Sequence, residues 1–309
     1  VTAGSLLNLA LLAIAAYVLI GAFGDVDLET FAEAVRGASW WWLAFALVLA
    51  QIPRIPSAVS TMGSIERPLP LGPLTALQFA ICFVNLAIPS TAARVAVNVR
   101  FFQRFGVSPA MAMTAGVIDS VSGFIVQIAI FLVLFFTSDL DLGLSLDLSD
   151  TSGAATVVLI ALVVIVVAVV VVLAIAPLRR RVVGAYHHAV SGLRVLRSPT
   201  KLLQLFLGNL ASQVLFAVAF GACALAFHQD LPLSQLLLIN TVVSLFAGLL
   251  PVPGGIGVTE AGLTYGLTVA GVPSDTAFAI ALAYRVCSFY LPPTWGWFCY
   301  HWLIKRRYL

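Results

Sequence analysis

The stretch "LLPVPGGIGVTEAG", Leu249 to Gly262, interrupts an apolar region with two prolines, four glycines and one glutamate. Proline breaks a helix because it lacks a backbone N–H, and glycine permits a tight reversal because it readily adopts a positive φ. Broken backbone at membrane depth leaves polar groups unpaired, so it persists only where it lines a cavity enclosed by protein or water. We therefore expect a broken helix and a polar site here.

The surrounding composition is typical of a polytopic helical membrane protein. Of the 309 residues, 61% are hydrophobic and 9% are charged, and the mean hydropathy is +1.06. Apolar runs of about 20 residues, long enough to cross a bilayer core, recur from end to end. We interpret residues 1–309 as one all-α transmembrane domain. Because the sequence begins directly in an apolar segment, we expect it to be part of a longer polypeptide, with a soluble domain fused to it or associated with it.

Charges between the apolar segments predict the orientation. Cytoplasmic loops of membrane proteins carry an excess of Lys and Arg. This rule places the residue 177–201 loop and both termini in the cytoplasm, and it places the acidic linker 137–153 outside a plasma (inner) membrane. The basic loop should also contact anionic lipids. The residues behind this assignment are Arg179, Arg180, Arg181, Arg194, Arg197, Lys201, Lys305, Arg306 and Arg307 inside, and Asp139, Asp141, Asp147 and Asp150 outside.

Two apolar segments are interrupted before they can cross. Leu71 to Ile88 ends at Pro89, and the basic residues that follow it suit a return to the cytoplasm, so we read Leu71 to Arg104 as a re-entrant hairpin. In the second half, Leu236 to Leu250 is broken at Pro251 and Pro253, and Thr259 to Ala270 leads back. Full spans are expected at residues 6–23, 40–62, 110–136, 154–176, 202–227 and 277–297.

Each half therefore has the order span, span, broken hairpin, span. The halves run in opposite directions, which predicts an inverted-topology repeat with a site at the repeat interface. Repeat one covers residues 1–136, and repeat two covers residues 154–309. Free N–H groups beyond each break would suit an anion.

Four charged residues lie within the broken-helix units. Under the repeat, Arg94 corresponds to Glu260 and Asp119 to Arg285, with the signs exchanged. These charges could form salt bridges that lock the hairpins, or Arg94 or Arg285 could hold a lipid phosphate while the acids position them or attract an amine. We expect Gln78, Asn209, Gln213 and Asn240 to cluster nearby. The candidate substrate-binding residues are Arg94, Asp119, Glu260, Arg285, Asn85, Pro89, Pro253, Gly254, Gly255 and Gly257.

The broken stretch is followed by "GVPSDTAFAIALAYRVCSFYLPPTWGW", Gly271 to Trp297. Together they closely resemble the transmembrane region of lysylphosphatidylglycerol synthase, which is shared by the multiple-peptide-resistance-factor flippases and a wider flippase-like family. The resemblance implies transfer of a phospholipid or lipid-linked molecule between leaflets. Arg94 stands where the family commonly has an acid. These 309 residues hold no soluble aminoacyl-transferase domain, so the resemblance does not imply synthesis.

We therefore expect a lipid flippase-like transporter that accepts an anionic headgroup in a cavity between the repeats. One alternative is an integral membrane enzyme in which Glu260 or Asp119 acts as a general base on a lipid-linked substrate. Another is a membrane scaffold of a larger lipid-modifying synthase. We expect no cofactor, no metal and no nucleic-acid partner, since His187 and His188 lack further ligands and the glycines lack the setting of a nucleotide fingerprint. The sequence leaves an oligomer open.

Overall fold

The computed structural model describes residues 28–87, 91–137, 198–249 and 253–309. These residues form helices and connecting turns, with no strand among them. Three helical stretches are long and apolar enough to cross a membrane, namely Trp40–Gly63, Pro109–Phe135 and Pro199–Ala226. The expected all-α membrane protein is thereby confirmed. The expected spans 6–23 and 154–176, the acidic linker and most of the basic loop lie outside the described residues.

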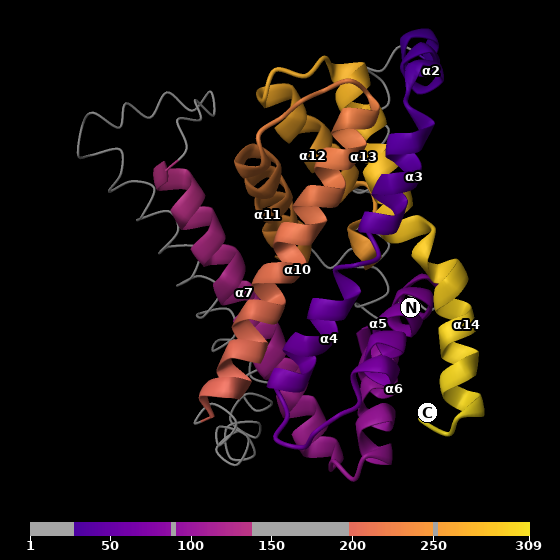
Figure 1. Ribbon diagram of the computed structural model, residues 1–309, viewed down its shortest axis with the longest axis vertical. Coiled ribbons are helices and arrows are strands. Elements are labelled where there is room, and N and C mark those ends of the chain that lie inside the picture. Colours follow the sequence, from indigo (N-terminus) through magenta and orange to yellow (C-terminus); the bar gives the residue numbers. More distant parts are fainter. Residues whose placement is uncertain (1–27, 88–90, 138–197, 250–252) are drawn as a thin grey trace, which may run out of the picture.

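The described helices fall into two groups along the chain, before and after residues 138–197 (Figure 1). The first half contains α2 (Leu28–Gly37), α3 (Trp40–Leu49), α4 (Arg54–Gly63), α5 (Leu71–Ala87), α6 (Thr91–Arg104) and α7 (Pro109–Thr137). The second half contains α10 (Pro199–Ala226), α11 (Leu233–Leu249), the 3₁₀ turn η2 (Pro253–Gly255), α12 (Val258–Val269), α13 (Ser274–Arg285), the π-helical turn η3 (Val286–Tyr290) and α14 (Pro292–Lys305).

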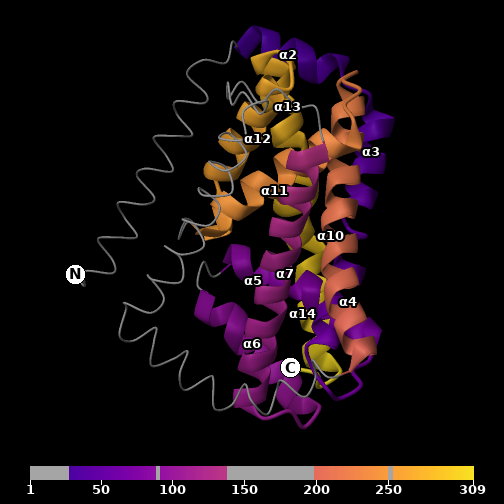
Figure 2. The same ribbon diagram turned by 90° about the vertical axis from the view of Figure 1, so that its left-hand side faces the viewer.

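The buried side chains form two hydrophobic clusters at opposite ends of the long axis (Figures 1 and 2). The upper core joins α3 to α10, α11, α12 and α13 around Phe220, Leu263 and Ile280. The lower core joins α4, α5, α6 and the start of α7 to α14 around Leu77 and Phe101. Both cores therefore draw helices from both halves of the sequence.

The predicted span 40–62 has the expected extent but is two helices. α3 ends at Leu49, the chain turns through residues 50–53, and α4 begins at Arg54. Pro53 explains the break, because it lacks the N–H that a continuous helix would need. The expected span 277–297 is likewise interrupted, by the π-turn η3. At these two interruptions the chain passes from the upper core to the lower core.

The two expected hairpins are each a pair of separate helices. α5 ends at Ala87 and α6 begins at Thr91, and the two helices contact each other. α11 and α12 also contact each other, and η2 lies between them in the chain. Within the expected first hairpin the structure thus describes two helices, Leu71–Ala87 and Thr91–Arg104. The α5–α6 pair lies in the lower part and the α11–α12 pair in the upper part of Figure 1. That they are re-entrant, and related by an inverted repeat, stays a prediction.

Glycines bring α4 and α10 into backbone contact. A Cβ added at Gly63 would lie 2.5 Å from the backbone nitrogen of Leu205, and one at Gly208 would lie 2.6 Å from that of Ser60. Ser57 and Ser212 also share a hydrogen bond of 2.9 Å across the crossing. Small residues serve this purpose in membranes, where helices associate through close packing and interhelical hydrogen bonds.

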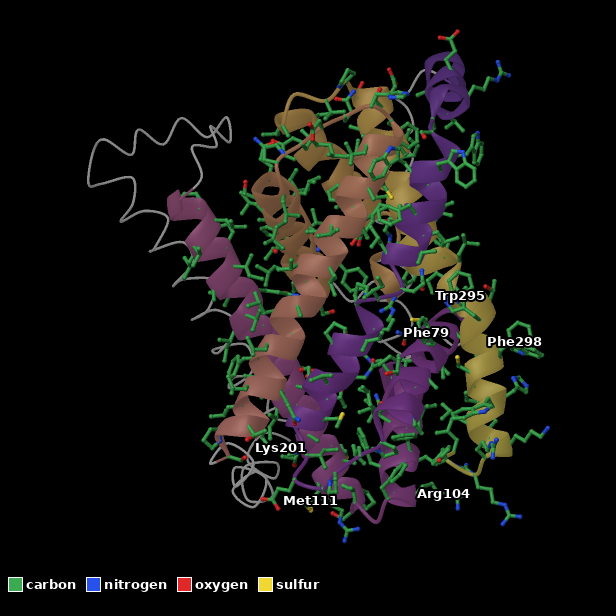
Figure 3. All side chains as sticks on the ribbon, in the orientation of Figure 1. Phe79, Arg104, Met111, Lys201, Trp295 and Phe298 are labelled. Carbon is green, nitrogen blue, oxygen red and sulfur yellow. The ribbon has the colours of Figure 1, made fainter. Side chains whose placement is uncertain are left out.

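A second close crossing joins α14 to α5. A Cβ added at Gly296 would lie 2.4 Å from the carbonyl oxygen of Phe79. Figure 3 shows Phe79 and Trp295 at this crossing. The last helix of the chain is thus held against the first broken pair.

We predict that Gly208→Ala destabilises the protein even though alanine favours helix. The added methyl would meet the α4 backbone, and overpacking typically costs about 1–3 kcal/mol. Gly116→Ala on α7 is the matched control, because a Cβ there has no neighbour within 4 Å. Melting temperatures in detergent should fall for Gly208→Ala and stay level or rise for Gly116→Ala. Equal melting temperatures would contradict the backbone contact.

Candidate functional site

The turn between α11 and α12 has a conformation that needs glycine. Gly254, Gly255 and Gly257 have φ values of 67°, 63° and 84°. A side chain at Gly254 would also collide with Phe289, whose ring lies 2.3 Å from the position of an added Cβ. The glycines of the sequence therefore serve both the reversal of the chain and its close packing on η3.

Glu260 ties this turn to the rest of the protein. It is the third residue of α12, and its Oε2 accepts a hydrogen bond of 2.7 Å from the backbone N–H of Gly257 just before the helix. This is the carboxylate half of a capping box. Its Oε1 accepts hydrogen bonds from Arg285 Nε at 2.8 Å and from the Tyr290 hydroxyl at 2.7 Å. Glu260 is 2% exposed, so these donors replace water.

Arg285 completes the same arrangement. Its Nη2 donates to the Gly254 carbonyl at 2.9 Å, and its guanidinium lies 4.2 Å from the centre of the Phe289 ring. The residue is 7% exposed. We call Gly254, Gly257, Glu260, Arg285 and Tyr290 the Glu260 brace. It pairs the polar groups released by the break between α11 and α12 and fixes that break to α13 and η3.

Asp119 is the centre of a separate polar cluster on α7. Ser60 donates to its Oδ1 at 2.5 Å, and Thr61 donates to its Oδ2 at 3.0 Å. Asn209 Nδ2 lies 3.4 Å from Oδ1 and also donates to Ser60 at 2.6 Å. The donors come from α4 and α10, so the cluster joins α7 to the close α4–α10 crossing.

Further amides and hydroxyls extend this cluster. Asn209 Nδ2 contacts the Ser122 hydroxyl at 3.0 Å, and Gln78 Nε2 donates to Thr61 at 3.2 Å. We call Asp119, Ser60, Thr61, Asn209, Ser122 and Gln78 the Asp119 cluster. Among the described residues, no cation pairs with Asp119. Its carboxylate is held by neutral donors alone.

The other predicted residues are dispersed. Arg94 is exposed on α6, and Asn85 is half-buried near the end of α5. Pro253 begins η2, whereas Pro89 lies outside the described residues. η2 contacts α5, so the second break does lie against the first broken pair.

The predicted polar liners belong to separate networks. Gln78 and Asn209 are in the Asp119 cluster, whereas Asn240 accepts a hydrogen bond of 3.1 Å from Tyr284 inside the upper core. Gln213 is half-buried on α10. The distribution differs from the single cluster that we expected because the polar residues follow the helices into two different cores.

Sequence reasoning missed two polar residues at the α3–α4 break. Gln51 Nε2 donates to the Cys287 carbonyl at 3.0 Å, and Arg54 Nη2 donates to the Ser288 carbonyl at 2.9 Å. Trp295 Nε1 in turn donates to Gln51 Oε1 at 3.2 Å. The α3–α4 break and the η3 turn therefore contact each other through polar groups. The signal was the "QIPRIP" stretch at residues 51–56, which places two polar side chains and two prolines inside an apolar segment.

The hydrogen bonds of Glu260 and Asp119 leave neither carboxylate well placed for proton transfer. Each oxygen of Glu260 already accepts at least one strong hydrogen bond, and both oxygens of Asp119 are engaged too. A general base must reach the proton that it removes, and these carboxylates are directed at the protein itself. They act first as anchors of interrupted or crossing helices.

We predict that Arg285→Ala lowers the melting temperature strongly. The change leaves Glu260 as an unpaired buried charge, and breaking a buried pair typically costs about 3–5 kcal/mol. Arg94→Ala removes the same side chain at an exposed site and should have little effect. Thermal unfolding of both variants in detergent tests this. A normal melting temperature for Arg285→Ala would contradict the brace and indicate that water reaches Glu260.

The sequence was compared with curated proteins and with models of protein families. A comparison with curated proteins gave no match. A family model described as "Lysylphosphatidylglycerol synthase TM region" matches residues 6–296, which include every helix from α2 to α13 and the start of α14. The match includes both polar clusters and all the interruptions described above. The chain therefore belongs to the lysylphosphatidylglycerol synthase transmembrane-region family.

Proposed function

We propose that the protein is a flippase-like transporter that moves a phospholipid, or a lipid-linked molecule with an anionic headgroup, between leaflets. Its family makes it a membrane protein associated with lipid modification or flipping. The finer assignment rests on where its polar groups lie. Arg94, Asp119, Glu260, Arg285, Asn85, Pro89, Pro253, Gly254, Gly255 and Gly257 remain its proposed substrate-site residues.

The observation that carries the proposal is the polar junction between the two hydrophobic cores. At this junction the α3–α4 break meets η3, and η2 contacts α5. A headgroup crossing a bilayer needs polar partners at the depth where lipid offers none. Interrupted helices provide such partners while their own polar groups remain satisfied inside the protein.

The distribution of basic residues supports an orientation of the protein in the membrane. Arg104 and Lys201 lie at the lower end of the molecule in Figure 3, and the C-terminus lies there in Figure 1. The last residues before the C-terminus include Lys305, Arg306 and Arg307. By the positive-inside rule this end faces the cytoplasm. The junction then lies between the two membrane faces, with one core on either side.

An integral membrane enzyme is less well supported. The two buried carboxylates that could act as bases, Glu260 and Asp119, are occupied by internal donors. Among the described residues, no group of three or more His, Cys, Asp or Glu side chains is arranged to hold a metal ion. We therefore base the proposal on transport.

Transfer of lipid can be measured directly in proteoliposomes that carry a headgroup-labelled fluorescent anionic lipid. Adding an impermeant quencher reports how fast label from the inner leaflet reaches the outer one. Wild-type protein should accelerate this exchange well above protein-free liposomes. Exchange at the protein-free rate would contradict the transporter proposal.

We predict that Asp119→Asn slows transfer by about tenfold, which corresponds to about 1.4 kcal/mol in the barrier. Asparagine keeps the size of the side chain, so packing at the α4–α10 crossing should be retained. Its amide cannot supply the negative charge that would attract an amine or position a cation. Glu33→Gln, at an exposed position on α2, is the matched control and should transfer at the wild-type rate. Equal rates in the two variants would remove Asp119 from the transport site.

A further inference from the structure

Arg54 is a second cation inside the membrane portion, and it differs from Arg285 in how its charge is balanced. It begins α4 in the middle of the Trp40–Gly63 span, at the junction between the two cores. Arg285 lies immediately before η3, and Arg54 contacts the same turn through the Ser288 carbonyl. The two guanidinium groups thus approach one five-residue turn from different helices.

The charge of Arg285 is matched and that of Arg54 is not. Arg285 pairs with Glu260 at 2.8 Å. Among the described residues, no carboxylate forms an ion pair with Arg54. Its Nη2 donates to one carbonyl, and its guanidinium lies 5.3 Å from the centre of the Phe216 ring. These contacts stabilise a cation through dipoles and a ring quadrupole but leave its net charge in place.

One donor of Arg54 also lacks a partner. Its Nε is buried and makes no hydrogen bond. A buried N–H without an acceptor is uncommon and costly, and a cation within a membrane span is costly when it has no counter-ion. An anion bound at Arg54 would supply both a hydrogen-bond acceptor for Nε and a negative charge to balance the guanidinium. A phosphate oxygen is the acceptor best matched to the planar fork of a guanidinium.

The surroundings of Arg54 indicate that such an anion arrives with a lipid. Ile52 and Ile55 flank it in sequence and are 36% and 46% exposed, so the outer side of the α3–α4 break presents apolar side chains. In a membrane these face acyl chains. A phospholipid could place its phosphate at Arg54 while its chains remain along this apolar surface.

We propose that Arg54 binds the phosphate of the phospholipid headgroup during its passage through the junction. The inference rests on the proposed transport function and adds the residue and the chemical group that meet. Arg285 then has a different duty: with Glu260 it maintains the turn against which the phosphate is presented. Arg54, unlike Arg285, has no carboxylate partner among the described residues, so its positive charge can be offered to the phosphate.

Binding can be tested on the purified protein in an uncharged detergent. The probes are short-chain phosphatidylglycerol, diacylglycerol with the same chains but no phosphate, and inorganic phosphate. Dissociation constants come from the concentration dependence of the melting temperature and from native mass spectrometry. Wild-type protein should bind phosphatidylglycerol at least about tenfold more tightly than diacylglycerol.

Arg54→Gln should remove this preference, so that both lipids bind equally weakly. Arg54→Lys keeps the charge but loses the fork, and it should weaken phosphatidylglycerol binding by several-fold while leaving diacylglycerol binding unchanged. Arg36→Gln on α2, which removes an exposed arginine, should bind both lipids as the wild type does. If Arg54→Gln does not fold, the lipid affinities of Arg54→Lys test the proposal instead. Wild-type affinity for phosphatidylglycerol in whichever variant folds would overturn the proposal.

Three further outcomes separate this inference from its alternatives. If inorganic phosphate displaces phosphatidylglycerol at equal concentration, the site binds the free anion as tightly as the lipid, and the lipid assignment is overturned. If Arg54→Gln transfers labelled lipid at the wild-type rate, the role of Arg54 fails while the transporter proposal stands. If the wild type binds phosphatidylglycerol through Arg54 but transfers nothing, the phosphate site stands and transport fails.

Discussion

Every interruption of a helix in an apolar surrounding must have its freed polar groups paired within the protein, and this requirement organises the whole structure. The clearest case is Glu260, one buried carboxylate that accepts hydrogen bonds from the start of its own helix, from Arg285 and from Tyr290. Together with the bond from Arg285 to the Gly254 carbonyl, it links the glycine-rich turn after α11 to α13. At η3, Gln51 and Arg54 donate to two carbonyls of the π-turn. At the α3–α4 break, the Pro53 carbonyl accepts from Ser57 and Ser212.

Pairing the α3–α4 break with η3 also explains why the polar groups of Gln51 and Arg54 lie at the boundary between the two cores. A helix that runs through one core can remain regular because side chains cover it on all sides. The chain leaves one core for the other at the α3–α4 break and at the π-turn η3. Carbonyls of η3 that are freed there accept hydrogen bonds from Gln51 and Arg54. The place that the structure needs to stabilise is thus also the place of the proposed phosphate site, and Arg54 belongs to both.

Much of this arrangement follows from local sequence. Pro251, Pro253 and the glycines after them predicted the break before α12, and the charges at Glu260 and Arg285 identified two residues of its brace, because each breaks the apolar pattern around it. The partners were harder to foresee. Tyr290 reaches Glu260 only because η3 adds a π-turn, for which the sequence has no local signal. Ser60 and Thr61 resemble ordinary small residues of a span until α7 brings Asp119 to them.

The glycine contacts between α4 and α10 have a mechanical consequence. Where backbone lies against backbone at Gly63 and Gly208, no space remains between the two helices for even one methyl group. The two helices therefore pack as a unit, and Asp119 links α7 to it. In the transport that we propose, we therefore expect this unit to keep its shape and the helices joined to it through turns to move.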